Sequence, residues 1–83
     1  MAVLEIVYTV TALKALKRIS KVDAGSIITK IESHAADRTK GDVKKLKGSE
    51  LFRLRHGDYR AIFAVTSGVL EVRDIAHRRN IYR

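Results

Sequence analysis

The sequence of 83 residues contains no cysteine. Disulfide bonds and zinc sites built from thiolates are therefore excluded, and a chain of this length forms one domain at most. We expect residues 1–83 to fold as a single domain whose small core is held by packing alone or with the help of a partner. The absence of cysteine is compatible with a reducing cytoplasm, where we expect the protein to act.

Long apolar runs are missing as well. No segment approaches the roughly 20 apolar residues that are needed to cross a bilayer. The first ten residues are mostly apolar, but they carry Glu5 and lack a basic leader. We therefore expect a soluble protein that has neither a targeting segment nor a membrane partner.

The residue patterns of several catalytic classes are absent. The 3 histidines are scattered and no acidic cluster stands at ligand spacing, so the sequence gives no basis for a zinc or magnesium site. A glycine-rich phosphate loop is missing, and so is the pair of carboxylates that a glycosidase uses. We expect neither a metal ion nor a cofactor.

Acidic residues are scarce relative to basic ones. Nine Asp and Glu residues stand against 17 Lys and Arg residues, which gives a net charge of +8 and a pI near 10.2. An imbalance of this size in a small domain favours a polyanionic partner. Nucleic acid is the first candidate and an acidic protein the second, while a basic pI that merely aids solubility is the alternative without a partner.

The first half of the sequence shows one strand pattern and two helix patterns. Residues 3–10 are rich in β-branched and aromatic side chains, with alternate residues from Leu4 to Val10 on one apolar face. Thr11 is the expected N-cap of a first helix, and Ser20 opens a capping box for a second one. His34 is expected on the solvated outer face of that second helix.

The second half predicts a three-stranded meander. Residues 37–50 form a polar, basic connection, and strands are expected at residues 51–56, 59–65 and 69–75, separated by glycine-containing turns. The last six residues, 78–83, are long enough for one helical turn or a tail. We predict the α+β class with the order β-α-α-β-β-β: a small, mainly antiparallel, twisted sheet with two helices packed on one face and a short C-terminal turn or helix.

Arginine recurs on one predicted strand face. Residues two apart on a strand lie on the same face about 7 Å apart, which pairs Arg53 with Arg55. Arg60 follows the turn and joins this face if the hairpin register allows. Three guanidinium groups on one face repel each other unless an anion lies among them, and arginine suits bidentate phosphate contacts. A solvated outer face would explain the alternation, but Lys, Glu or Thr would serve there equally well, so we predict phosphate binding.

Two further segments carry candidate binding or catalytic residues. The basic connection contributes Lys44, Lys45 and Lys47 to predicted phosphate contacts, and the final segment contributes Arg79 and Arg83.

The final segment also holds His77, Arg78 and Tyr82. Histidine exchanges protons near neutral pH, and a tyrosine ring can stack on a base. A lone histidine is more often structural, and for His56, which falls on an apolar strand face, we expect a half-buried structural role.

An enzyme with these residues and no metal would act on an anionic substrate. RNA cleavage fits, because RNA supplies its own nucleophile, the 2′-hydroxyl. The protein then provides a base, a cation for the charge of the transition state and an acid for the leaving 5′-oxygen. DNA lacks the 2′-hydroxyl, so this chemistry would select RNA.

Three stretches of the sequence resemble the RelE family of toxins from bacterial toxin–antitoxin systems. They are LKG at positions 46–48, LFRLRHGDYRAIF at 51–63 and IAHRRNIYR at 75–83. The resemblance covers essentially the whole chain and extends to the order of the elements. It implies an mRNA endonuclease that enters the ribosomal A site, and an antitoxin that is encoded beside the toxin, wraps it and represses the shared operon.

The resemblance also implies roles for individual residues. Arg60 would hold the scissile phosphate, Arg78 would stabilise charge or assist the leaving group, and Tyr82 would orient the RNA or stack on it. Arg53 and Arg55 stand where well-known family members have lysines. Arginine stays protonated, so neither is a plausible general base. Either His77 takes that role, or the base is missing and the ribosome aligns the 2′-hydroxyl.

Two other functions are open at the level of sequence. A ParE-like toxin resembles the same fold but poisons DNA gyrase, and that branch generally lacks the basic and aromatic tail seen here. A nucleic-acid-binding module without catalysis would need only the charge. Products ending in a 2′,3′-cyclic phosphate would distinguish the nuclease from the binding module.

Overall fold

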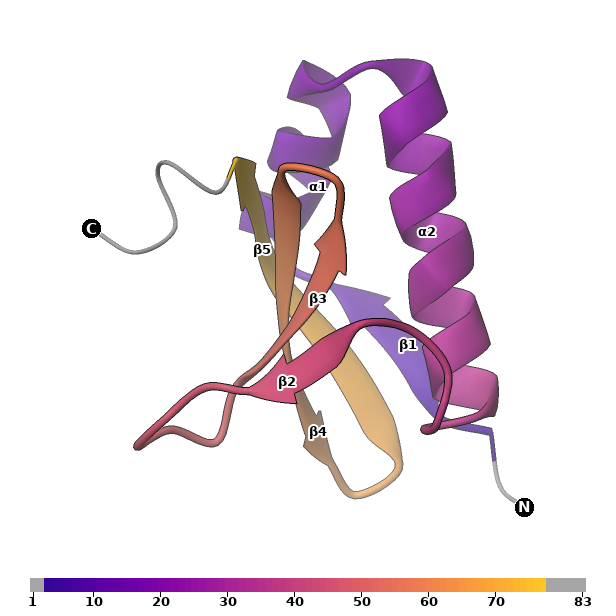
Figure 1. The fold of residues 1–83 in the computed structure, drawn as a ribbon, viewed down its shortest axis with the longest axis vertical. Coiled ribbons are helices and arrows are strands. Elements are labelled where there is room, and N and C mark those ends of the chain that lie inside the picture. Colours follow the sequence, from indigo (N-terminus) through magenta and orange to yellow (C-terminus); the bar gives the residue numbers. More distant parts are fainter. Residues whose placement is uncertain (1–2, 78–83) are drawn as a thin grey trace.

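A computed structural model describes residues 3–77. In chain order the elements are β1 (Glu5–Tyr8), α1 (Val10–Arg18), α2 (Lys21–Ala36), β2 (Val43–Lys45), β3 (Phe52–His56), β4 (Tyr59–Thr66) and β5 (Val69–His77). The strands form one sheet in the order β1-β5-β4-β3-β2, in which β1 runs parallel to β5 and the other neighbours are antiparallel. Both helices lie on one face of this sheet (Figure 1). The predicted α+β class and layer arrangement are confirmed.

The sequence-based element order lacked one strand. Val43–Lys45 lies in the segment predicted as a connection and pairs antiparallel with β3, Lys44 opposite Arg53. Three residues are too few to show an alternating pattern, so the pairing partner determines this strand. The predicted turn or helix at residues 78–83 lies outside the described residues.

The helix starts follow side-chain capping. Thr9, not Thr11, is the N-cap of α1: its hydroxyl oxygen accepts from Ala12 N at 3.1 Å and donates to the Arg73 carbonyl at 2.8 Å. The predicted cap of α2 is confirmed, since Ser20 Oγ accepts from Asp23 N at 3.0 Å. Because the helix begins at Val10, that side chain leaves the predicted apolar strand face and is 67% exposed.

The core lies between the helices and the sheet. Its largest fully buried side chains are Phe63, Ile27, Ile31, Leu54, Leu70 and Val72. No helix in the described part of the chain is long and apolar enough to span a membrane.

The prediction that His34 is solvated was wrong, because the side chain is only 3% exposed. His34 follows Ile31 by one helical turn and so belongs to the buried stripe. Its Nδ1 donates to the Lys40 carbonyl at 2.7 Å, and its Nε2 accepts from Arg38 Nε at 3.2 Å. The ring also packs tilted against Phe63, with centroids 5.5 Å apart. His34 therefore fastens the end of α2 to the following loop.

Replacing His34 with alanine is expected to lower the free energy of unfolding by about 2–3 kcal/mol, through a cavity and two lost hydrogen bonds. Ser33→Ala, at the exposed neighbouring position, should change the unfolding free energy by less than about 0.5 kcal/mol. Urea denaturation of both variants measures the difference, and equal losses would show that the buried contacts of His34 contribute nothing.

Candidate nucleic-acid interface

Four basic residues of β2, β3 and β4 share the sheet face that the helices leave open. In the strand register Arg55 stands opposite Arg60, and Arg53 stands between Ile62 and Lys44. Directly opposed residues project to the same face, while Leu54 and Ala61, one position along, belong to the core under the helices. The alternation therefore predicted the shared face correctly. We call Lys44, Arg53, Arg55 and Arg60 the arginine face.

Arg55 and Arg60 converge on one backbone carbonyl. Arg60 Nη1 donates to the Gly57 carbonyl at 2.9 Å and to the Tyr59 carbonyl at 3.0 Å, and Arg55 Nε donates to the same Gly57 carbonyl at 3.3 Å. Gly57 has a φ of +56°, a left-handed conformation that suits glycine. The turn between β3 and β4 thus orients both guanidinium groups.

Within residues 3–77, no neighbouring acid neutralises the two charges. Arg60 is 9% exposed, and no ion pair joins Arg55 or Arg60 to a carboxylate anywhere in residues 3–77. Directly opposed like charges destabilise a sheet, and burial of a cation without an anion adds to this cost. A bound anion would reduce the repulsion between the two arginines and the cost of burying Arg60 without a counter-ion. The pair of Arg55 and Arg60 is therefore a candidate anion site.

Arg53 is partly compensated. Its Nη1 lies 3.4 Å from Asp42 Oδ1 and 3.5 Å from the Asp42 carbonyl oxygen. The Arg53 side chain is 12% exposed and the acid is half exposed. Because this ion pair is long and its acid faces solvent, it contributes little to stability, and Arg53 can exchange Asp42 for an external anion.

The predicted lysines are divided between the two sides. Lys44 stands on the arginine face, whereas Lys45 is paired with Phe52 and so projects toward the helix side. Lys47 is exposed in the loop after β2.

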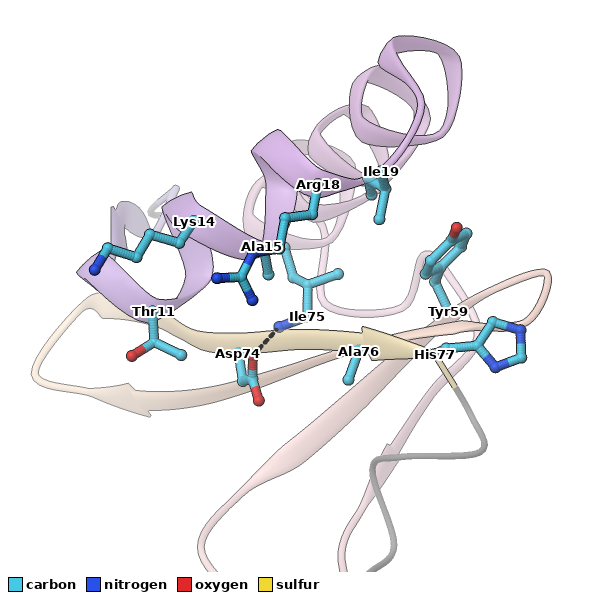
Figure 2. A pocket seen from close by; sticks show the side chains of 10 residues that line it. All are labelled: Thr11, Lys14, Ala15, Arg18, Ile19, Tyr59, Asp74, Ile75, Ala76 and His77. Atoms are coloured by element: carbon cyan, nitrogen blue, oxygen red, sulfur yellow. Dashed lines mark hydrogen bonds between the residues drawn. The ribbon is translucent and has the colours of Figure 1, made fainter.

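The structure does not bring His77 to the arginine face. Tyr59 is paired with His77, and Arg60 is paired with Ala76, so His77 shares the helix-side face of Tyr59. His77 Nε2 lies 3.8 Å from Asp58 Oδ2, and the ring meets the Tyr59 ring edge-on at 5.8 Å (Figure 2). The other tail residues with predicted roles lie outside the described residues: Arg78, Arg79, Tyr82 and Arg83.

The model of the ParE toxin family of the type II toxin–antitoxin system parDE matches residues 6–82 of the sequence. The chain belongs to this family. The resemblance to toxins of the RelE/ParE superfamily is thereby confirmed.

Solved structures support the same assignment of the ParE-family toxin. This toxin is similar to a chain of the RelB–RelE antitoxin–toxin complex from Methanococcus jannaschii. The two chains are 29% identical and superpose with a TM-score of 0.79, and the match covers 92% of this chain and 94% of that one. The RelE–RelB complex from Pyrococcus horikoshii OT3 gives 26% identity, a TM-score of 0.79 and coverage of 94% and 98%. The RelBE complex from E. coli, at 17% identity, a TM-score of 0.71 and coverage of 89% and 95%, shares the fold. No curated protein sequence matches this toxin.

Sequence reasoning missed the acceptor groups of this toxin's arginine face. The Gly57 carbonyl and the Asp42 side chain orient the arginines, and neither is marked by a pattern beyond the turn signal at Gly57. Burial raises the pKa of the Tyr8 phenol, and hydrogen bonds from Thr39 lower the pKa of the Asp37 carboxyl, but both groups lie away from the arginine face. Within the described residues, no group of three or more His, Asp or Glu side chains gathers as metal ligands would.

Proposed function

We propose that this toxin is an endoribonuclease that enters the ribosomal A site, cleaves the mRNA there and so inhibits translation in the cytoplasm. The observation that supports this proposal most strongly is the arrangement of Arg55 and Arg60. Both side chains donate to the Gly57 carbonyl, and neither has an acidic partner in residues 3–77. A phosphodiester is the anion that fits two adjacent guanidinium groups on an open sheet face. The 29% identity to a RelB–RelE chain supports the nuclease branch.

In the proposed reaction the RNA supplies the nucleophile and the protein supplies charge. The 2′-oxygen bonds to phosphorus while the bond from phosphorus to the 5′-oxygen breaks, which leaves a 2′,3′-cyclic phosphate and a 5′-hydroxyl. Arg60, assisted by Arg55, neutralises the charge that builds on the phosphoryl oxygens. Arg53 and Lys44 bind flanking phosphates. Arg78 stabilises the charge on the leaving 5′-oxygen, which takes its proton from water, and Tyr82 stacks on the RNA.

The 2′-hydroxyl proton needs an acceptor that the arginine face does not contain, because arginine remains protonated. Since His77 shares a sheet face with Tyr59 rather than with Arg60, we propose that ribosomal alignment, with water as proton acceptor, replaces a protein base. His77→Gln should therefore leave the cleavage rate within about threefold of wild type. Loss of a general base would instead lower the rate by about 100-fold or more. Single-turnover cleavage of mRNA on programmed ribosomes measures this rate. A loss of about 100-fold would indicate that His77 is the general base after all.

A partner follows from the family. We propose a cognate, RelB-like antitoxin with an acidic or amphipathic segment, through which alone the toxin reaches operator DNA. The ribosome and its mRNA are the other partners.

The decisive experiment incubates the purified toxin with translating ribosomes in the presence and absence of EDTA. Breaks within codons, with cyclic phosphate ends and in both conditions, are the expected result. Intact mRNA would overturn the proposal.

Inhibition of DNA gyrase is the second candidate, because the family model is that of the ParE toxin. Purified gyrase, the toxin and a supercoiled plasmid test it. Gyrase-dependent double-strand breaks, without mRNA cleavage on ribosomes, would establish this alternative. A toxin that binds RNA but neither cleaves mRNA nor causes gyrase-dependent breaks would be a nucleic-acid-binding module without catalysis.

A further inference from the structure

Strand β5 contains a β-bulge at Arg73. The partners of β4 on this strand pass from Val72 directly to Asp74, so Arg73 is an extra residue in the pairing. Thr9 holds the bulge, because its hydroxyl donates to the Arg73 carbonyl at 2.8 Å. A bulge changes the direction of the side chains that follow it, and bulges are frequent beside functional sites.

The bulge places Asp74 on the open face of the sheet. Val72 belongs to the core, and in an unbroken strand Asp74, two residues later, would point to the same core side. With the extra residue, Asp74 stands opposite Ile62 instead. It thereby joins the cross-strand row that contains Arg53 and Lys44 of the arginine face. Figure 2 shows the Asp74 carboxylate on the side of β5 away from α1. The basic face therefore carries a carboxylate.

Asp74 and Arg60 are diagonal neighbours on this face. Arg60 is paired with Ala76, two residues along β5 from Asp74, and diagonal neighbours of this kind lie roughly 7–8 Å apart. Within residues 3–77, no ion pair joins Asp74 to a basic side chain. The Arg60 guanidinium donates to two backbone carbonyls, and Asp74 Oδ1 accepts from Ile75 N at 2.8 Å. Neither charge neutralises the other, so both can meet a ligand.

The two positions between these charges are apolar. Ile62 precedes the diagonal on β4, and Ala76, which contributes only a methyl group, completes it on β5. The four positions thus combine a cation, an apolar surface and a hydrogen-bond acceptor. A nucleotide has the matching groups: a phosphate, a flat ring and the donors of the base edge. Phosphate contacts position a nucleic acid, whereas contacts to base edges select its sequence.

The negative charge of Asp74 indicates which part of an RNA it contacts. A carboxylate repels phosphates, but it accepts hydrogen bonds from the donors on the edges of unstacked bases. Guanine has two adjacent donors on its Watson–Crick edge, N1–H and the N2 amino group, which suit the two oxygens of one carboxylate. Uracil has a single N–H between two carbonyl oxygens, and a carboxylate repels those oxygens. Asp74 therefore favours guanine and disfavours uracil.

We propose that Asp74 determines the base preference of this toxin by accepting hydrogen bonds from a guanine beside the phosphate that Arg55 and Arg60 bind. The contact with Ile75 N is compatible with this role, because each carboxylate oxygen has two acceptor sites. The inference rests on the proposed nuclease function and adds the base that the nuclease selects.

The test compares wild type with Asp74→Asn, which keeps the size of the side chain but replaces one acceptor oxygen with a donor. Single-turnover cleavage is measured on programmed ribosomes whose A-site codons carry guanine or uracil at one position and are otherwise identical. At one codon position wild type should cleave the guanine codon about tenfold faster or more, as a good base contact discriminates. Asp74→Asn should reduce this ratio to about threefold or less.

The matched control is Glu71→Gln. Glu71 lies on the same strand and the same sheet face, opposite Ala64, and its substitution makes the same change of charge. The control should keep the preference for guanine. Loss of the preference in both variants would assign it to net charge, and an unchanged preference in Asp74→Asn would also overturn the inference. A loss of about 100-fold on every codon in Asp74→Asn would make Asp74 a general base instead of a base contact.

Titration of short RNAs tests the same contact without cleavage. Each RNA carries a methylated 2′-hydroxyl at the cleavage position and either guanine or uracil beside it. Wild type should bind the guanine RNA about tenfold more tightly, and Asp74→Asn should bind both RNAs with similar Kd values. A wild-type toxin that cuts no mRNA contradicts the proposed function, and the titration then decides the inference by itself. Equal affinity of the wild type for both RNAs would overturn it.

Discussion

Replacing Arg60 with glutamine is expected to lower the rate of mRNA cleavage on ribosomes by about 100- to 1000-fold, the usual effect of removing one preorganised donor to a transition-state anion. Arg60 is nine-tenths buried and donates to two backbone carbonyls, so its guanidinium is fixed before RNA binds. Arg60→Lys keeps the charge but loses the planar fork, and it should fall between glutamine and wild type. Single-turnover cleavage at saturating ribosome concentration measures the rates.

The matched control for Arg60 is Arg73→Gln. Arg73 lies on β5 with a side chain 53% exposed and pairs with Glu71 at 2.9 Å. Its loss removes the same charge from the same open sheet face, but outside the four residues of the arginine face, so cleavage should stay within about twofold of wild type, as expected for a surface substitution. A comparable loss in both variants would mean that only net charge matters, which contradicts a defined phosphate site.

The second large effect is expected at Gly57, whose carbonyl accepts from both Arg55 and Arg60. A Cβ added there meets no atom within 4 Å, so the cost of a substitution comes from the positive φ alone. Gly57→Val should lower the free energy of unfolding by about 1–2 kcal/mol. By shifting the carbonyl, it should also reduce cleavage about 10- to 100-fold. Asparagine tolerates this conformation, so Gly57→Asn should restore most of both.

A matched turn variant separates stability from positioning. Gly68 also has a positive φ, +79°, with no obstruction around an added Cβ, and it lies in the turn between β4 and β5. Gly68→Val should lose similar stability in urea denaturation yet retain cleavage. An equal loss of cleavage in the Gly57 and Gly68 variants would show that the Gly57 carbonyl has no specific role in positioning Arg55 and Arg60.

Local patterns determined the parts of the fold that could be predicted. The alternation around Arg53 and Arg55 predicted their shared face, because strand parity is a property of consecutive residues. Ser20 was recognised as a cap because its partner Asp23 is three residues away. The features that the sequence did not predict depend on pairing between strands that are distant in the chain. β2 exists because it pairs with β3, and β1 is parallel to β5 across the intervening helices.

The candidate site could be predicted only in part for the same reason. The position of His77 depends on a register that pairs it with Tyr59, and a shift of one residue would have placed it beside Arg60. His34 was misplaced because a histidine on a helix stripe was assigned by polarity instead of by its spacing from Ile31. The shared Gly57 carbonyl depends on two side-chain conformations that no sequence pattern specifies.

Arginine-detected ¹⁵N NMR tests most directly whether Arg55 and Arg60 bind one phosphodiester together. The toxin is titrated with a short RNA whose reactive 2′-hydroxyl is methylated, so that it binds without being cut. The Nε signals of Arg55 and Arg60 should shift together along one binding curve, while that of Arg73 stays in place. RNA binding that shifts the signals of other basic residues but leaves those of Arg55 and Arg60 unchanged would contradict a shared phosphate site at these two arginines.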